Sequence, residues 1–234
     1  MFDLPKHFAA RVASFEQECA RLAREGGGHD AVVFLGDSLV EYYRGPLALT
    51  NRGICSDHLH WPDVNVFQRL GPNRLHPNPR AIVTLVGIND LNDAPDALDQ
   101  HLSLYQTLMS TLAHSYPQAS LGVCSLLPTR GTYSHLNPAI QQFNRRLSDL
   151  AASSGAAFLN LHERFLDPRT GMARAGWLVA DGIHISRRGY AELTTVVEAH
   201  AADLGVARVP RQTLSEGLTR AWRKLWTRVT SPPA

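Results

Sequence analysis

Apolar and polar residues follow two different patterns along this chain. Short apolar runs are typical of buried strands, and they cover residues 31–35, 49–53, 81–86, 120–125 and 157–161, the run at 49–53 being the weakest. Apolar residues that recur every three or four positions predict helices over 97–114, 138–152 and 187–204. This alternation is typical of βαβ units, so we expect an α/β fold in which helices cover both faces of a parallel sheet.

Long connections interrupt this pattern at 71–80, 126–137 and 167–182, and each carries Pro, Gly or Asn. Loops of this length are usually functional or mobile. The one shift in composition comes near Val209, where a basic segment begins. We therefore expect one domain over residues 1–205 and a separate tail over 206–234.

Composition excludes several classes of protein. Hydrophobic residues make up 44% and charged residues 19%, which is typical of a soluble globular chain. The first thirty or so residues lack the apolar region of a secretory signal, which favours a cytoplasmic protein. A net charge of +2 is too close to neutral to indicate nucleic-acid binding. The three cysteines form no CxxC pair, which disfavours a disulfide framework and a zinc cluster.

Ser38 stands out because it follows the first strand directly, in AVVFLGDSLVEYY (31–43). A serine becomes a nucleophile only when a histidine takes its proton and a carboxylate orients that histidine. The segment VADGIHIS places Asp181 three residues before His184, close enough for this pairing. The alternatives are that Ser38 caps the following helix and that Asp181 and His184 form an ordinary surface turn.

An oxyanion also needs hydrogen-bond donors, and two further strand ends offer them. Asn89 follows the apolar run of VTLVGIND, and Gly53 follows the short strand LTNRG. The carboxyl ends of parallel strands meet at one edge of a sheet, so these residues are expected to lie near Ser38. Asn89 has the alternative interpretation of a turn residue at a strand end.

Four blocks, FLGDSLVE, NRGICSD, VGINDL and DGIHIS, occur in this order between residues 31 and about 190. In these blocks the chain resembles the GDSL, or SGNH, hydrolase family, and in particular bacterial esterases related to the catalytic subunits of platelet-activating-factor acetylhydrolase. The resemblance implies a flavodoxin-like three-layer αβα sandwich with a central parallel five-stranded sheet. It also implies no cofactor and a small-molecule acyl ester or thioester as substrate.

By this resemblance Ser38 is the nucleophile, His184 the general base and then acid, and Asp181 the residue that orients it. The oxyanion hole would combine the N–H groups of Ser38 and Gly53 with the Asn89 side chain. The chain departs from the family in carrying Ser56-Asp57-His58 where many relatives have Gly-Asp-Thr, and Val40 where many have Thr. These departures affect the expected shape of the pocket, and hence the choice of substrate, more than they affect the expected reaction.

The substrate is expected to be a short-chain acyl or O-acetyl ester. The loop before His184 and residues 127–136 should reach the edge of the sheet that carries Ser38. The bulk of Trp177 in this loop indicates a pocket for short acyl chains. The alternative is that Trp177 packs in the core. The residues expected to contact the substrate are Leu39, Ile54, Ile88, Trp177 and Ile183. An acyltransferase or thioesterase on the same site, or a catalytically silent binding protein, are the alternatives.

Two further features invite interpretation. His58 and His60 lie two apart, but no third ligand with a recognised spacing accompanies them, so we expect a pocket rim or solvated turn and no metal site. In the tail, residues 211–229 combine a Leu and Trp stripe with Arg and Lys, which predicts an amphipathic basic helix. Such a helix either docks on its own domain or on a second subunit of a homodimer, or contacts a membrane surface peripherally.

Overall fold

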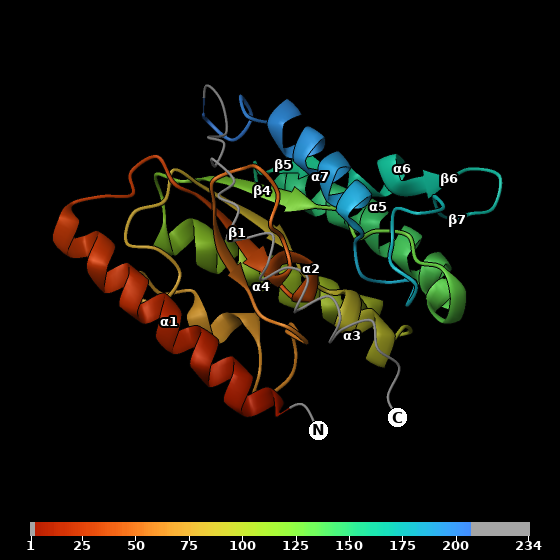
Figure 1. Cartoon of the computed structure of the whole chain (residues 1–234), viewed down its shortest axis with the longest axis horizontal. Helices are drawn as coiled ribbons and strands as arrows, with labels where there is room; N and C mark the ends of the chain where they lie inside the picture. The colour runs from red at the N-terminus through yellow and green to blue at the C-terminus, as the bar shows by residue number, and fades with distance from the viewer. Residues whose placement is uncertain (1–2, 207–234) are drawn as a thin grey trace.

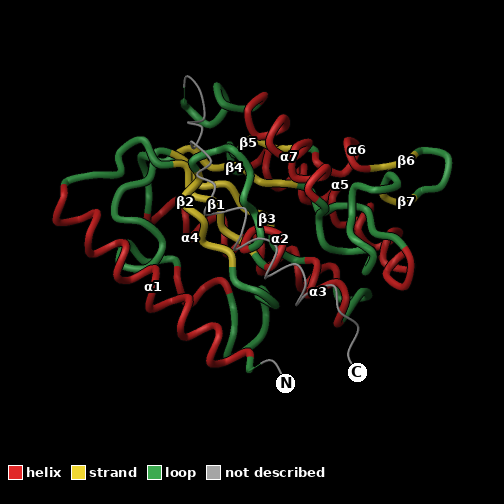
Figure 2. Tube along the Cα trace, viewed as in Figure 1, coloured by secondary structure: helices red, strands yellow, loops and turns green. Residues whose placement is uncertain are grey.

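The computed structural model of the protein describes residues 3–206, so the amphipathic segment 211–229 lies outside the described residues. A five-stranded parallel sheet forms its centre, with the strand order β2-β1-β3-β4-β5 (Figure 2). The strands are β1 (Val32–Gly36), β2 (Leu49–Gly53), β3 (Ala81–Leu85), β4 (Ser120–Cys124) and β5 (Ala157–Leu159). Each predicted strand is confirmed to within two residues at either end.

Side chains alternate between the two faces of the sheet and so identify the helix layers. Phe34 on β1 contacts Tyr43, and Tyr43 contacts Tyr190 of α7 (Arg187–Ala199) on one face. On the other face, Thr84 of β3 hydrogen-bonds the Tyr105 hydroxyl of α4 (Leu98–Ser115) at 2.7 Å. Helix α5 (Asn137–Ser153) packs beside α4 (Figure 1). The predicted three-layer α/β fold is therefore confirmed.

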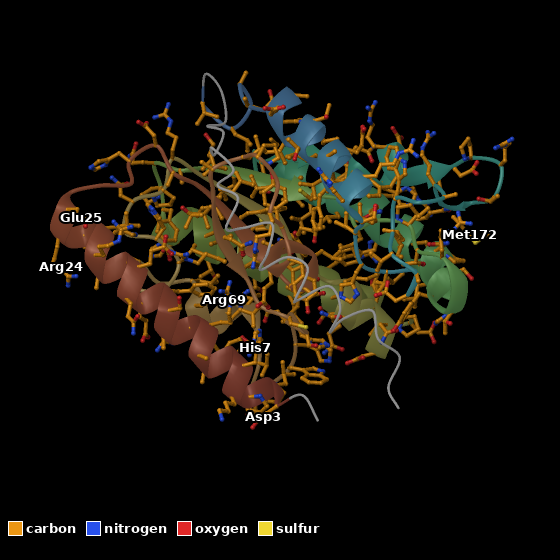
Figure 3. All side chains as sticks on the ribbon, viewed as in Figure 1. Asp3, His7, Arg24, Glu25, Arg69 and Met172 are labelled. Carbon is orange, nitrogen blue, oxygen red and sulfur yellow. The ribbon has the colours of Figure 1, made fainter. Side chains whose placement is uncertain are left out.

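The first helix, α1 (Leu4–Glu25), was not predicted from the sequence. It begins at an Asp3 cap whose carboxylate accepts the Lys6 N–H, and it ends at Gly26 in the left-handed conformation. Its apolar residues form a small separate cluster with residues that follow β2: Phe8, Phe15, Ile54 and Val64. Figure 3 shows Glu25, at the end of α1, and Met172 at opposite ends of the molecule.

Several short elements lie between the main strands and helices. Helices α2 (Ser38–Glu41) and α3 (Ile88–Asp93) begin just after β1 and β3, at the carboxyl edge of the sheet. The other short elements are η1 (Val66–Arg69), η2 (Gly131–Leu136), α6 (Leu161–Phe165), β6 (Leu166–Asp167) and β7 (Met172–Ala173). The last predicted helix is shorter than expected, because α7 ends at Ala199 and turns follow. Within residues 3–206, no helix is both long and apolar enough to span a membrane.

Candidate active site

Ser38 lies at the first turn of α2, just after strand β1. Its neighbour Asp37, not Ser38, caps this helix, because the Asp37 carboxylate accepts the Leu39 N–H at 2.8 Å. Burial raises the pKa of Asp37 to about 8, although the hydrogen bond from Leu39 opposes the shift. The Ser38 hydroxyl is thus left for another partner, and it lies 3.0 Å from Nε2 of His184.

His184 and Asp181 form a pair at the other end of this contact. Nδ1 of His184 lies 2.7 Å from Oδ2 of Asp181, while Oδ1 accepts the N–H groups of Ile183 and His184 at 3.0 Å each. Partial burial alone would raise the pKa of Asp181, but these hydrogen bonds outweigh it and lower the pKa to about 2. An ionised carboxylate only accepts, so Nδ1 carries the imidazole proton and the Nε2 lone pair faces Ser38.

Tyr42 also belongs to this site, although it was not among the site residues predicted from the sequence. Its ring lies 5.5 Å from the His184 ring, and its hydroxyl donates to the Cys55 sulfur at 3.5 Å. Tyr42 follows Ser38 by four residues, and residues four apart share a face of a helix. That spacing is the signal from which Tyr42 could have been found.

Asn89 lies in the first turn of α3, at the carboxyl end of β3. Its Nδ2 donates to the backbone carbonyl of Asp57 at 2.9 Å. An amide nitrogen carries two protons, so this bond fixes the side chain and leaves one donor. Asn89 is therefore held as an oriented donor, as its predicted role requires.

Gly53 does not play the role predicted for it in the oxyanion hole. Its N–H donates to Oδ1 of Asn51 at 2.9 Å, so it does not offer a free donor to an oxyanion. A Cβ at Gly53 would lie 2.1 Å from the Glu41 nitrogen, so only glycine lets β2 approach α2 this closely. The structure thus gives Gly53 a packing role beneath α2, and we do not assign it to the oxyanion hole.

Ser56 has the free backbone donor that Gly53 lacks. It is the one non-glycine residue with a positive φ in residues 3–206, at 59°, and its N–H meets no acceptor within that range. A positive φ is a conformation that glycine adopts without strain, and the resemblance noted from the sequence implies a glycine at this position in many relatives. A serine in place of glycine is therefore the sequence signal from which the role of Ser56 could have been found.

Buried charges hold the segment that carries Ser56. Asp57 forms an ion pair with Arg69, and both side chains are fully buried. Arg69, labelled near the middle of the molecule in Figure 3, also donates to the Gly36 carbonyl at 3.0 Å. Closer to Ser56, the Cys55 N–H donates to the Glu41 carboxylate at 2.5 Å. The backbone after β2 is therefore tied to both β1 and α2.

The residues expected to contact a substrate are mostly packed elsewhere. Leu39, Ile54 and Ile88 are at most 3% exposed and belong to the hydrophobic clusters, whereas Ile183 is partly exposed. The Trp177 ring packs edge-on against Phe165, and two arginine side chains lie over it, Arg174 and Arg188. Within the predicted segment 127–136, Leu127 and Leu136 are also buried.

The model of the GDSL-like lipase/acylhydrolase family matches residues 20–192. A structure described provisionally as a platelet activating factor from Streptococcus pneumonia is 22% identical, with a TM-score of 0.65 over 82% of this chain and 94% of that one. A GDSL-like lipase from Bacteroides thetaiotaomicron is 18% identical, with a TM-score of 0.61 over 80% and 98%.

An acetylxylan esterase from Geobacillus stearothermophilus, Axe2, is 15% identical, with a TM-score of 0.52 over 80% of this chain and 99% of that one. At these identities the likeness concerns the fold. No curated protein sequence matches this chain closely enough to count as a relative.

Proposed function

Because the chain belongs to the GDSL-like lipase/acylhydrolase family, we propose that this hydrolase is a serine esterase acting on carboxylic esters through an acyl-enzyme on Ser38. The observation that carries the proposal is the continuous path from Ser38 Oγ to His184 Nε2 (3.0 Å) and from His184 Nδ1 to Asp181 Oδ2 (2.7 Å). These are the contacts that an activated serine needs.

Acylation begins when Ser38 Oγ attacks the ester carbonyl carbon and its proton passes to Nε2 of His184. Asp181 stays ionised throughout, in keeping with its low pKa, and stabilises the imidazolium that forms. His184 then gives the proton to the leaving alkoxide. The alcohol departs and the acyl group stays on Ser38.

Three donors would stabilise the oxyanion of the tetrahedral intermediate. They are the backbone N–H groups of Ser38 and Ser56 and the second proton of the Asn89 amide. The Ser56 N–H replaces the Gly53 N–H of the sequence prediction, since Gly53 already donates to Asn51. Donors fixed in advance in this way act without reorganisation when the charge develops.

Deacylation repeats the same steps with water. His184 Nε2 removes a proton from water, which attacks the acyl carbon, and the same three donors hold the second oxyanion. His184 then returns the proton to Ser38 Oγ as the carboxylic acid leaves. The cycle restores the starting protonation of all groups.

The proposed substrates are esters with short acyl or O-acetyl groups. Leu39, Ile54 and Ile88 are buried in the hydrophobic clusters, so the apolar residues beside the motifs are already packed and offer a long acyl chain little surface. The Tyr42 ring beside His184 and the partly exposed Ile183 are the side chains left to contact the acyl group. The acetyl ester named for Axe2 is consistent with this size.

The test is hydrolysis of p-nitrophenyl esters from acetate to dodecanoate by the protein and by Ser38→Ala. We expect the variant to lose at least about 10⁴-fold in kcat, since no other group supplies the nucleophile. Ser153→Ala, an exposed serine at the end of α5, is the matched control and should keep full activity. Equal rates for Ser38→Ala would overturn the mechanism. A preference for dodecanoate over acetate would overturn the short-chain proposal alone.

A further inference from the structure

Three separate segments bring two imidazoles and a carboxylate together outside the proposed catalytic groups. His60 follows β2, Asp90 lies on α3 and His101 lies on α4, and one donor atom from each lies within 4.8 Å of the others. Asp90 and His101 are at most 1% exposed, and His60 is half-buried. No step of the proposed esterase mechanism uses these three side chains.

His101 has a buried nitrogen with nothing to bind. Its Nε2 lies 2.9 Å from the Ala94 carbonyl, and a carbonyl only accepts, so Nε2 carries the proton. Nδ1 is then a lone-pair donor, and it is buried with no hydrogen-bond partner among residues 3–206. A histidine that binds a metal commonly donates its other N–H to a backbone carbonyl, which is the arrangement of His101.

Hydrogen bonds fix the Asp90 carboxylate in place, and its oxygens still have lone pairs available for a cation. Its carboxylate accepts the Leu59 N–H at 2.9 and 3.1 Å and hydrogen-bonds His60 Nδ1 at 2.6 Å. Two carboxylate oxygens offer about four lone-pair positions, so a cation could still bind there. The His60 nitrogen that faces the cluster is Nδ1, so a bound ion would take the place of the proton shared by Nδ1 and Asp90, and Nε2 would carry the imidazole proton.

We propose that His60, Asp90 and His101 form a binding site for a divalent transition-metal ion, with Zn²⁺ as the first candidate. Two imidazoles and one carboxylate are a donor set that suits zinc. Zinc binds such ligands at about 2.0–2.2 Å, so small side-chain movements would draw the three donor atoms together. The ion would link the chain after β2 to α3 and α4.

The sequence predicts no metal site here, because no third ligand with a recognised spacing accompanies His58 and His60. The structure separates the two histidines. His58 stacks on Trp61 with ring centroids 4.2 Å apart and pairs with Asp93, whereas His60 contacts Asp90. The missing ligands lie 30 and 41 residues further along the chain, and no local spacing joins them to His60.

The test uses the full chain after dialysis against EDTA, titrated with ZnCl₂ by calorimetry and with CoCl₂ by visible absorption. We expect saturable binding of one ion per chain and a melting temperature that rises with Zn²⁺. His60→Ala and His101→Gln should each weaken Zn²⁺ binding at least about 100-fold. Loss of a residue that only hydrogen-bonds to a metal ligand already lowers the affinity of a site by up to about this factor, and loss of a ligand should lower it at least as much. His114→Ala, an exposed histidine on α4, should bind as the unchanged protein does.

His60→Ala is the decisive variant because His60 is half-buried and its loss should not unfold the chain, which circular dichroism would verify. His58→Ala, which leaves all three ligands in place, should change the affinity by no more than a few-fold. The absence of saturable 1:1 binding would overturn the proposal. So would a His60→Ala variant that binds Zn²⁺ as tightly as the unchanged protein, or His58→Ala losing binding while His60→Ala keeps it.

Discussion

Asp181 and His184 contact each other across three residues of sequence, whereas the segment after β2, residues 54–61, depends on partners far along the chain. The first pair is partly exposed and needs only one turn of backbone to form. The second region is held by the buried Asp57–Arg69 ion pair and by the Asp90 carboxylate. The orientation of His184 by Asp181 is thus set by local spacing, whereas two of the proposed oxyanion donors, the Ser56 N–H and the Asn89 side chain, are set by a buried polar network.

The two regions should also respond differently to mutation. Removing a group of the local pair should affect catalysis while leaving folding nearly intact, because the pair is partly exposed. Removing a charge of the buried network should affect folding first, because an unpaired buried charge is unfavourable.

Among the variants that test this comparison, the largest effect is expected for Asp181→Asn, which keeps the shape of the site. The amide would present an N–H to His184 Nδ1 or a carbonyl without charge, so the histidine tautomer and its charged form lose support. We expect kcat to fall about 10³–10⁴-fold, whereas the melting temperature should fall by only about a few degrees because the pair is partly exposed. A loss of less than tenfold in ester hydrolysis would remove Asp181 from the mechanism.

The same variant carries a prediction for acid stability. The folded-state pKa of Asp181 is lowered from 3.8 to about 2, so its contribution to the free energy of unfolding is present above pH 4 and is lost as the pH falls from 4 to 2. Urea unfolding of Asp181→Asn should therefore depend less steeply on pH across this window. An unchanged slope would contradict the assigned hydrogen bonds.

Arg69→Met should break the buried network. It leaves the Asp57 carboxylate buried without its partner and removes the donor to the Gly36 carbonyl, so we expect a loss of about 3–5 kcal/mol in the free energy of unfolding. Urea denaturation is the measurement. Arg74→Met is the matched control, because its ion pair with Glu16 is about 40% exposed and should contribute no more than about 1 kcal/mol. Equal losses in the two variants would contradict the comparison.

Asn89→Ala removes one proposed oxyanion donor and the bond to the Asp57 carbonyl. We expect kcat for p-nitrophenyl acetate to fall about 10²–10³-fold, with a smaller effect on KM, since the lost donor acts mainly on the transition state. Asn92→Ala, an exposed position on the same helix α3, should keep its rate. Full activity in Asn89→Ala would exclude the side chain from the oxyanion hole.

The smallest effect is expected for Ser56→Gly. The proposed role belongs to the backbone N–H, which the substitution retains, so kcat should stay within a few-fold. Glycine adopts the 59° φ without strain, so stability should rise by up to about 1 kcal/mol. Ser56→Val, which is strained at this φ, should lose stability in the same urea assay. A large loss of activity in Ser56→Gly would assign the role to the hydroxyl.

The sequence by itself determined the strands, the main helices after residue 97 and the pair Asp181–His184. Buried strands need continuous apolar runs, and a three-residue spacing can be satisfied within one turn, so both are local properties of the chain. Helix α1 was also readable, since Phe8 and Phe15 lie seven residues apart on one face.

Only the tertiary structure decided which backbone N–H stays free and which buried residues meet. Gly53 ends β2 and Ser56 follows it. The Asn51 side chain occupies the Gly53 N–H, and that side chain is held by its own donation to the Val40 carbonyl of α2 at 2.6 Å. The position of His101 beside His60 depends on how α4 packs against the sheet. Hydrogen-bond competition and contacts between distant segments depend on the whole fold, so no local pattern in the sequence encodes them.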